Sequence, residues 1–363
     1  GPGVRKPAYA CAQHGSLRPM RVAQIMLAKR FGGAERSFVD LTIGLAERGL
    51  QVLAIGDPRG EALEKLPRHS NIQCARVKCR GVWDWLCSFR IKQHLVRFAP
   101  DLVQTHLARA AHLGGRAAHG AAPTLAKTHN LVNLSYYRYI DSLVATTNEQ
   151  QTYLLDNGIP ATAIVKIPNF CAFEPTAGAT RSAGEDLVIK SLGRFVEKKG
   201  FDLLLHAFAR VLISGVDARL EIAGAGPQGR VLGALAGELE LLDKVSFPGW
   251  TDDVQSFLSN AHVFVLPSRE EPFGIALLEA MACGVPIVST RTSGPLEVLN
   301  EETALLVDRD DPESLARAIT DIARDPHAAA KRAREAQRRF SENFDAKTVI
   351  DCYLEVYEDL TKQ

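Results

Sequence analysis

Acidic residues stand at unexpected positions in the segment SREEPFGIALLEAMACGVPIVST, residues 268–290. Apart from its acids and Cys283, most of the segment is small or apolar and is broken by glycine and proline. Glu271 precedes a Pro-Phe-Gly turn, and Glu279 follows within an apolar stretch. An unpaired buried charge is costly, so these carboxylates must be solvated, paired or functional. Glu270 is expected to face solvent.

The turn is followed by a predicted helix over residues 275–283. Helical geometry places Glu279 about two turns beyond Glu271 and roughly 80° around the axis, so both carboxylates could reach one ligand. Carboxylates accept hydrogen bonds from vicinal hydroxyls, and the free N–H groups from Gly274 to Leu277 suit a phosphate. For Glu271 the alternative is an acid that only stabilises the helix dipole.

Basic residues follow a predicted strand in the segment SLGRFVEKKGFDLLLHAF, residues 191–208. Arg194 comes just after the strand, and Lys198 and Lys199 lie in a short loop before a helix. A guanidinium fork and an ammonium charge that converge at the end of a strand suit a pyrophosphate. The alternative is a solvated surface loop, where a Glu-Lys-Lys run is usually found.

A glycine pair, Gly32 and Gly33, separates a strand from a helix in FGGAER. Backbone N–H groups there could approach an anion at the helix N-terminus. Glu35 would oppose a phosphate, so we expect it to cap its own helix or to bind a sugar hydroxyl. A plain strand-to-helix turn is the alternative.

His106 and His129 each end a predicted strand of the first half of the chain, and Asn130 follows the second of them. Binding residues gather at the carboxyl ends of parallel strands. Functional and structural roles are both open for this pair, whereas a structural role is expected for His112, His119 and His206.

The Asp308-Arg309-Asp310 triplet could hold a divalent ion on a diphosphate. It enters a predicted helix over residues 311–325, where acids act as caps and complement the helix dipole. We therefore predict no metal site and no required cofactor.

Strands and helices alternate along the chain in two series, which predicts two doubly wound α/β domains. The domains are expected at residues 20–170 and 186–340, joined by a Gly/Ala/Pro-rich linker, with a last helical segment at 341–363. Ligands would bind in a central cleft between them. The predicted strands are Met20–Leu27, Leu50–Asp57, Asp101–His106, Pro123–His129, Ser142–Thr147, Ala163–Asn169, Leu187–Gly193, Arg219–Gly224, Lys244–Gly249, His262–Ser268, Val285–Thr290 and Thr303–Asp308.

The composition excludes several classes of protein. With 43 Lys and Arg against 42 Asp and Glu in 363 residues, the chain lacks the global basic field of a nucleic-acid-binding protein. Seven cysteines without a CxxC pair fit a reducing cytoplasm better than a disulfide framework. No apolar run approaches the roughly 20 residues that cross a bilayer, and residues 1–19 are interpreted as an expression scar and a loose leader.

Aromatic and basic residues mix in GVWDWLCSFRIKQHLVRF, residues 81–98. An ordinary amphipathic helix with a basic outer face is slightly favoured. The alternative is a helix that contacts anionic lipid at the cytoplasmic face of the inner membrane.

Together these motifs resemble the retaining glycosyltransferases of the GT-B fold, in the class called family 4. Glu271–Val288 resembles the E-x7-E motif of that family, Gly193–Gly200 its diphosphate motif and Phe31–Arg36 its glycine loop. The resemblance covers nearly the whole chain. Within the family, the pattern of motifs in this chain is similar to that of bacterial enzymes that extend lipopolysaccharide core, polysaccharide or other glycolipid chains.

The resemblance implies a role for each motif. Arg194 and Lys199 would neutralise the diphosphate of a nucleotide-sugar donor without a metal, Glu271 and His129 would contact the donor sugar, and Glu279 the ribose. The implied donor-binding residues are Gly32, Gly33, Arg194, Lys199, Glu271, Phe273, Gly274, Ile275, Ala276 and Glu279. Glu35, His106 and Asn130 are the candidates on the acceptor side. The resemblance also implies that the last helical segment, at 341–363, returns to the first domain.

The resulting hypothesis is a cytoplasmic, metal-independent retaining glycosyltransferase, with UDP-sugar the preferred donor and a glycan or glycolipid the acceptor. Two alternatives remain. One keeps the fold and changes the reaction to that of a nucleotide-sugar epimerase or a phosphorylase. The other is a non-catalytic partner that binds sugar nucleotides.

Overall fold

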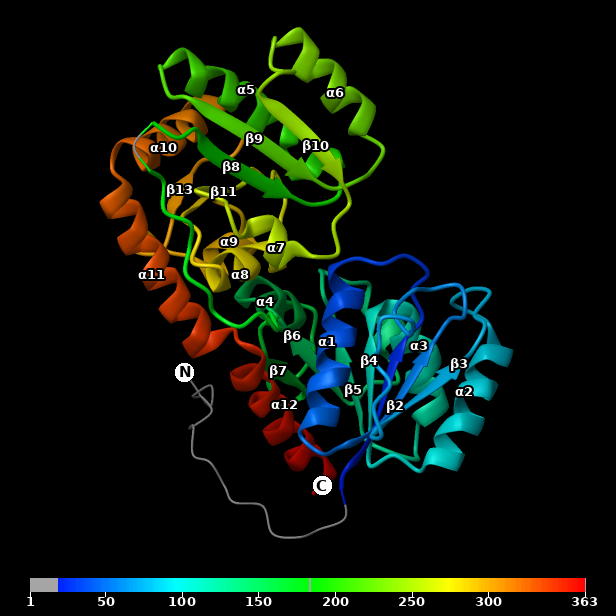
Figure 1. Ribbon diagram of the computed structural model, residues 1–363. Coiled ribbons are helices and arrows are strands. Elements are labelled where there is room, and N and C mark those ends of the chain that lie inside the picture. The colour runs from blue at the N-terminus through cyan, green and yellow to red at the C-terminus, as the bar shows by residue number, and fades with distance from the viewer. Residues whose placement is uncertain (1–18, 183, 363) are drawn as a thin grey trace. The chain divides into compact units, whose positions relative to one another are not determined.

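The computed structural model describes residues 19–182 and 184–362, so the leader predicted at the N-terminus falls almost entirely outside the described residues. The chain forms two compact units. The first comprises Gly1–Pro168 together with Ala346–Gln363, and the second comprises Asn169–Asp345. Each unit is built on its own parallel sheet (Figure 1).

The sheet of the first unit has the strand order β3-β2-β1-β4-β5-β6-β7, and all its neighbours pair in parallel. Its central strands are buried on both faces, as parallel sheets require. The strands are β1 (Arg21–Met26), β2 (Gln51–Gly56), β3 (Ile72–Arg76), β4 (Leu102–His106), β5 (Thr124–Lys127), β6 (Ser142–Ala145) and β7 (Ile164–Lys166).

Helices cover both faces of this sheet because side chains alternate along each strand. Ala23 and Ile25 of β1 pack in one cluster with residues of α2 and α3, whereas Met26 packs with Phe38 of α1. The C-terminal helix α12 lies against α1. The helices are α1 (Gly33–Glu47), α2 (Trp85–Phe98), α3 (Leu107–Ala118), α4 (Asn148–Asp156) and α12 (Ala346–Thr361), with short 3-10 turns η1 (Leu134–Tyr137) and η2 (Ala161–Ala163).

The second unit repeats this architecture with the strand order β10-β9-β8-β11-β12-β13. Its strands are β8 (Leu187–Leu192), β9 (Ala218–Ala223), β10 (Val245–Gly249), β11 (Val263–Leu266), β12 (Ile287–Thr290) and β13 (Leu305–Val307). Its helices are η3 (Glu197–Lys199), α5 (Phe201–Ile213), α6 (Gly229–Glu238), α7 (Val254–Leu258), α8 (Ile275–Ala282), α9 (Ser293–Val298), α10 (Pro312–Arg324) and α11 (Pro326–Asn343).

Two apolar clusters hold the second sheet between its helices. One joins the strands to α5 and α10, and the other joins them to α8 and α11. Helix α10 is capped by Asp311 as predicted, and a proline follows in its first turn. The carboxylate of Asp311 accepts from the backbone N–H groups of Glu313 at 3.1 Å and of Ser314 at 2.9 Å.

The predicted strands are confirmed apart from their ends, but the edge strand β3 was missed. Its residues are half exposed and include Gln73 and Arg76, so it lacks the continuous apolar run of a buried strand. Helix α2 begins at Trp85 rather than at the start of the predicted segment, because Asp84 caps it by accepting from Cys87 N–H. Strand β5 ends at Lys127, and His129 follows with a left-handed φ of 62°.

In each sheet, successive strands are first added toward one edge and then toward the other. This switch point lies between β1 and β4 in the first sheet and between β8 and β11 in the second. In open α/β sheets, ligands bind beyond the carboxyl ends of the strands at such a switch point. In the first unit this point is flanked by the loop after Met26 and by His106. In the second unit it is flanked by Arg194 and by the loop that contains Glu271.

None of the helices within the described residues is long and apolar enough to cross a bilayer.

Candidate active site residues in each unit

An ion pair joins the two predicted motifs of the second unit. Lys199 Nζ contacts Glu271 Oε2, although the residues lie 72 positions apart in the sequence. Ser268 Oγ donates to the same carboxylate oxygen at 3.3 Å. Glu271 is buried, with 7% of its surface exposed, so its charge depends on these partners. Lys199 and Glu271, one predicted functional residue from each motif, therefore form one charged pair.

Arg269 connects the loop that carries Glu271 to the segment around Lys199 through hydrogen bonds and ion pairs. Its guanidinium forms a fork with the carboxylate of Asp202, at 2.8 and 2.7 Å, and its Nε donates to Asp310 at 2.7 Å. The backbone N–H groups of Arg269 and Glu270 also donate to the carbonyl of Lys198, at 2.8 and 3.2 Å. A bidentate guanidinium contact fixes geometry as well as charge. Arg269 was not predicted as a site residue, because nothing near it in the sequence identifies its distant acidic partners.

Gly200 permits the close approach of the two loops. It has a φ of +66°, and a Cβ atom there would lie 2.1 Å from the carbonyl oxygen of Pro267. Only glycine adopts this conformation cheaply, and only glycine leaves room for that oxygen. Any side chain at this position would therefore force the backbone at Gly200 or at Pro267 to shift.

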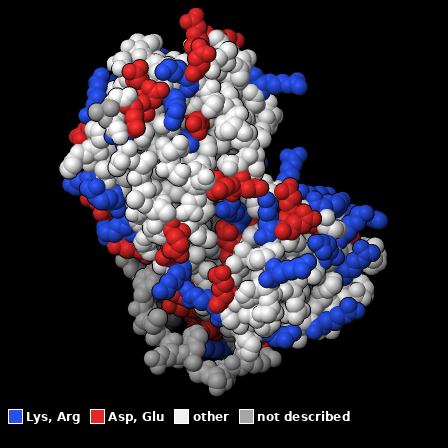
Figure 2. All heavy atoms as spheres, viewed as in Figure 1, with Lys and Arg blue, Asp and Glu red and all other residues white. Residues whose placement is uncertain are grey.

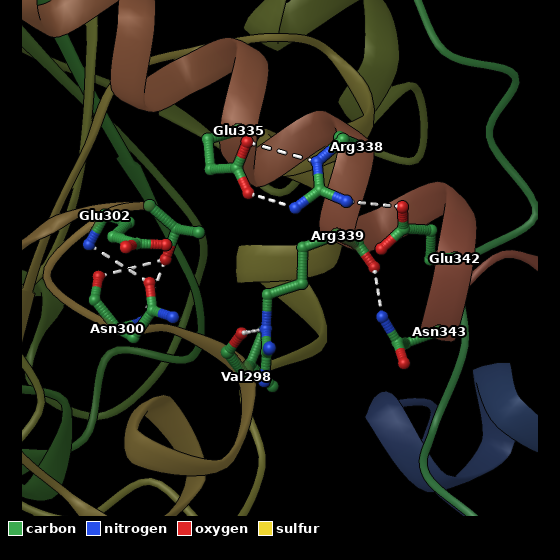
Figure 3. Close-up of polar contacts among 9 residues, drawn as sticks. Val298, Asn300, Glu302, Glu335, Arg338, Arg339, Glu342 and Asn343 are labelled. Carbon is green, nitrogen blue, oxygen red and sulfur yellow. Dashed lines mark hydrogen bonds and ion pairs between the residues drawn. The ribbon is translucent and has the colours of Figure 1, made fainter.

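Helices α9 and α11 support the Glu271 loop from behind. The backbone N–H of Gly294 in α9 donates to the carbonyl of Glu271 at 2.9 Å. From α11, Arg339 Nε donates to the carbonyl of Val298 at the end of α9, at 2.7 Å (Figure 3). The neighbouring Arg338 points instead to Glu335 and Glu342 of its own helix (Figure 3). A hydrogen-bonded chain thus runs from α11 through α9 to the site.

Helix α8 starts at Ile275 and carries no side-chain cap at its N-terminus. Gly274 precedes it with a φ of 90°. The N–H groups of Gly274, Ile275 and Ala276 at its start are consequently available to an anion. The prediction was wrong for Leu277, whose N–H donates to the carbonyl of Gly274 at 2.9 Å. Glu279, one turn inside the helix, is 5% exposed and has polar partners of its own. Arg194 is exposed just beyond the end of β8.

Both acids of the Asp308-Arg309-Asp310 triplet form ion pairs with arginine side chains. Asp310 pairs with Arg269, and Asp308 lies 3.8 Å from Arg291. Among residues 19–182 and 184–362, no group of three or more His, Cys, Asp or Glu side chains is arranged to hold a metal ion.

In the first unit the two predicted histidines meet at the switch point. His106 Nδ1 lies 3.3 Å from His129 Nε2, and both side chains are buried. His106 Nε2 lies 2.8 Å from Gln24 Oε1. Because an amide oxygen only accepts, His106 donates from Nε2 and accepts at Nδ1, so His129 must donate from its Nε2. This leaves Nδ1 of His129 unprotonated.

The histidine pair is connected to the C-terminal helix. Gln24 Nε2 donates to the hydroxyl of Tyr357 at 3.0 Å, and that hydroxyl donates to Gln104 Oε1. Both glutamines are fully buried in strands of the first sheet. Gln24 and Tyr357 were not predicted as parts of the site, since each stands among apolar neighbours in an ordinary strand or helix.

Lys127 is a further residue that the sequence analysis missed. It is fully buried at the end of β5, where its Nζ donates to Ser37 Oγ at 2.8 Å. Burial lowers the pKa of Lys127 to about 7, although the nearby Asp40 opposes this shift. Burial likewise raises the pKa of Asp40 to about 6.

Burial holds the pKa values of His106 and His129 well below the usual range, and the Lys127 ammonium lowers both further. Both rings are neutral in the folded protein, whereas the unfolded chain takes up protons below about pH 6.5. The free energy of unfolding should therefore fall as pH drops below about 6.5, by up to roughly 1.4 kcal/mol per pH unit for each histidine.

Urea unfolding of the wild type and of a His106→Asn/His129→Asn variant between pH 5 and 8 measures this contribution. The variant should show the shallower decline of unfolding free energy with acid. His327→Asn, at an exposed histidine, is the control and should keep the wild-type slope. Equal slopes for wild type and double variant would show that the pair is not held neutral.

A cavity of about 640 Å³ opens at this switch point within the first unit. Glu35, His106 and Asn130, the three residues predicted for the acceptor side, all line it. Helix α1 begins at Gly33 beside the cavity, and Gly32 carries no side-chain cap. The structure thus brings Glu35, His106 and Asn130 together in the first unit, and it joins Lys199 to Glu271 in the second.

Comparison with known proteins identifies the family. Residues 31–173 match the model described as Glycosyltransferase Family 4, and residues 174–343 match the one described as Glycosyl transferases group 1. Two lipopolysaccharide core biosynthesis glycosyltransferases of Rhizobium meliloti, LpsE and LpsD, are 32% and 29% identical to this chain. Each alignment covers 90% of this chain and 95% of the relative.

The solved structures agree on the fold. The Anabaena protein HepE, crystallised with UDP and glucose, matches with a TM-score of 0.81 at 20% identity, over 94% of this chain and all of that one. At that identity the likeness shows the fold alone. The predicted resemblance is confirmed: the chain belongs to glycosyltransferase family 4 and has the GT-B fold, with two Rossmann-like parallel-sheet domains.

Proposed function

We propose that this protein is a retaining, metal-independent hexosyltransferase. It moves a sugar from a UDP-sugar to a lipopolysaccharide core, a polysaccharide or another lipid-linked glycan. The names of LpsE and LpsD support the acceptor class, and the UDP and glucose in the HepE crystals support the donor.

The Lys199–Glu271 ion pair carries this proposal. An ammonium group has three N–H donors, so Lys199 can hold Glu271 with one and a diphosphate with the others. Arg194 adds a guanidinium fork, and the uncapped start of α8 adds backbone N–H groups. Fixed positive groups stabilise the negative charge that develops as the diphosphate leaves. This chemistry does not need a metal ion.

The sugar nucleotide is recognised through its hydroxyl groups in this account. Both side-chain hydrogen bonds of Glu271 to described residues involve Oε2, so Oε1 can accept from a donor-sugar hydroxyl. Glu279 accepts from the ribose hydroxyls. His129, unprotonated at Nδ1, accepts from the donor sugar, while Glu35, His106 and Asn130 serve the acceptor. In the N-terminal glycine loop, Gly32 and Gly33 let the backbone approach the donor.

Retention of configuration follows from attack on the face that the diphosphate leaves. The acceptor oxygen forms the new bond to the anomeric carbon as the bond to the diphosphate breaks. Its proton passes to an oxygen of the departing phosphate, so the reaction needs no separate protein base.

A lipid-linked acceptor places the enzyme at a membrane surface. Trp83 lies just before α2, and Trp85 and Phe89 lie in its first two turns; they are 71%, 63% and 53% exposed. Arg90 and Lys92 are exposed on the same helix. Figure 2 shows Lys and Arg side chains gathered on the side of the first unit that carries α2 and β3. We propose that this face contacts anionic lipid at the cytoplasmic side of the inner membrane. Failure to co-sediment with phosphatidylglycerol vesicles would contradict it.

A transfer assay with radiolabelled UDP-sugars tests the function. Label should move to truncated lipopolysaccharide or another lipid-linked glycan, in the presence of EDTA, with the anomeric configuration of the donor retained in the NMR spectrum of the product. If the UDP-sugar were converted as fast without an acceptor as with one, the protein would be an epimerase instead. An inverted product or loss of activity in EDTA would contradict the proposed mechanism.

A further inference from the structure

Positive charge dominates the cavity of the first unit. Lys29 and Arg30 line it from the loop between β1 and α1, and Arg109 lines it from α3. These elements converge because β1 and β4 are neighbours in the sheet and both end at the cavity. Lys29 and Arg30 are exposed and make no ion pair with any described residue.

Arg109 is the most constrained of the three cations. Its Nη1 donates to the carbonyl of Leu27 at 3.1 Å, which fixes the guanidinium at the wall of the cavity. Its Nε is buried and has no hydrogen-bond partner within the described part of the chain. No described carboxylate forms a salt bridge with it. A partly buried guanidinium without a counter-charge is costly unless an anion completes it.

The other lining groups do not neutralise this charge. Glu35 is the one carboxylate among the lining residues, and it is buried and already has a polar partner. His106 is neutral and tied to Gln24 and His129. The remaining polar side chains, on Thr128, Asn130, Asn133 and Tyr136, are two hydroxyl-bearing groups and two amides, all uncharged, which suit sugar hydroxyls.

We propose that this cavity binds an anionic group on the glycan acceptor, a phosphate ester or a sugar carboxylate, through Arg109, Lys29 and Arg30. The inference rests on the proposed function, because it treats the cavity as the acceptor site. If a neutral sugar filled the cavity, the positive charge of the three cations would be balanced by only one carboxylate, that of Glu35. An anion gives Arg109 its missing partner, and the guanidinium fork matches the oxygens of both phosphate and carboxylate.

The test measures binding of small acceptor-like probes by ligand-observed NMR in saturating UDP, which keeps phosphate out of the donor site. The probes are glucose 6-phosphate, glucuronate and glucose. At least one anionic probe should bind about tenfold more tightly than glucose, corresponding to roughly 1.4 kcal/mol. Whichever of glucose 6-phosphate and glucuronate binds more tightly identifies phosphate or carboxylate as the preferred anionic group.

A matched pair of variants assigns the binding to the cavity. Lys29→Ala/Arg30→Ala should remove most of the advantage of the anionic probe and should leave UDP affinity unchanged. Arg76→Ala/Lys78→Ala removes the same charge from exposed positions at and after β3, outside the cavity, and should have no effect. Arg109→Lys keeps the charge without the fork and should weaken the anionic probe while leaving glucose unaffected.

Anionic probes that bind no better than glucose would overturn the inference, as would equal losses in the two double variants. If UDP binds and transfer to a neutral glycan proceeds equally well, the anion inference fails while the proposed function stands. If neither UDP binding nor transfer is detected, the proposed function itself fails.

Discussion

Replacing Lys199 with alanine is expected to lower kcat for sugar transfer by about 10²–10³-fold, as for loss of one preorganised donor to a developing negative charge. The variant removes a cation at the proposed diphosphate and leaves the buried Glu271 carboxylate with the hydroxyl of Ser268 but without its counter-charge. It should therefore also lower the free energy of unfolding, by about 3–5 kcal/mol if the pair behaves as a typical buried ion pair. Steady-state kinetics and urea unfolding measure the two effects.

A second variant separates the two roles of Lys199. In Lys199→Met/Glu271→Gln neither charge remains, so stability should largely return while transfer stays lost. Lys198→Ala is the matched control, since this lysine neighbours Lys199 but its side chain forms no ion pair with any described residue. It should retain nearly full activity. If Lys199→Ala transferred sugar at the wild-type rate, the proposed stabilisation of the leaving group would be wrong.

Changing Glu279 to glutamine is expected to weaken UDP binding by about 10–100-fold, because hydrogen bonds to charged groups contribute roughly 1.5–3 kcal/mol. The substitution keeps the size of the side chain and removes its charge. If Glu279 binds the ribose, affinity for inorganic pyrophosphate should stay unchanged or rise slightly, since pyrophosphate has no ribose and is repelled by acids. Calorimetric titration with both ligands measures this contrast.

The control for this change is Glu270→Gln, at an exposed acid in the same segment. It should leave the affinity for UDP as in the wild type. Equal weakening of UDP and pyrophosphate by Glu279→Gln would indicate a general disturbance of α8. Unchanged UDP affinity would remove Glu279 from the nucleotide site.

Local signals predicted much of this fold. The start of helix α10 was predictable from its cap, Asp311, and from the proline that follows it, because both residues act within the first turn of the helix. Buried strands were visible as short apolar runs. The edge strand β3 was not, because it is half exposed and its pairing depends on the neighbouring β2.

The site was predictable in its parts and not in its connections. Lys199 and Glu271 were each singled out, but the ion pair between them exists only because β8 and β11 are neighbours in the folded sheet. Lys127 lies in a strand whose sequence does not reveal that its ammonium is buried. Tyr357 reaches Gln24 across 333 positions, which no local pattern encodes.

A thermal-shift panel of nucleoside diphosphates and their sugars tests the central claim most directly. A ligand at 100 times its dissociation constant stabilises the folded protein by about 2.7 kcal/mol, enough to raise the melting temperature measurably. We predict that UDP and a UDP-sugar raise it in the wild type and that Lys199→Ala and Glu279→Gln reduce the shift. If no nucleotide in the panel changes the melting temperature, the assignment of a donor site around Lys199, Glu271 and Glu279 is wrong.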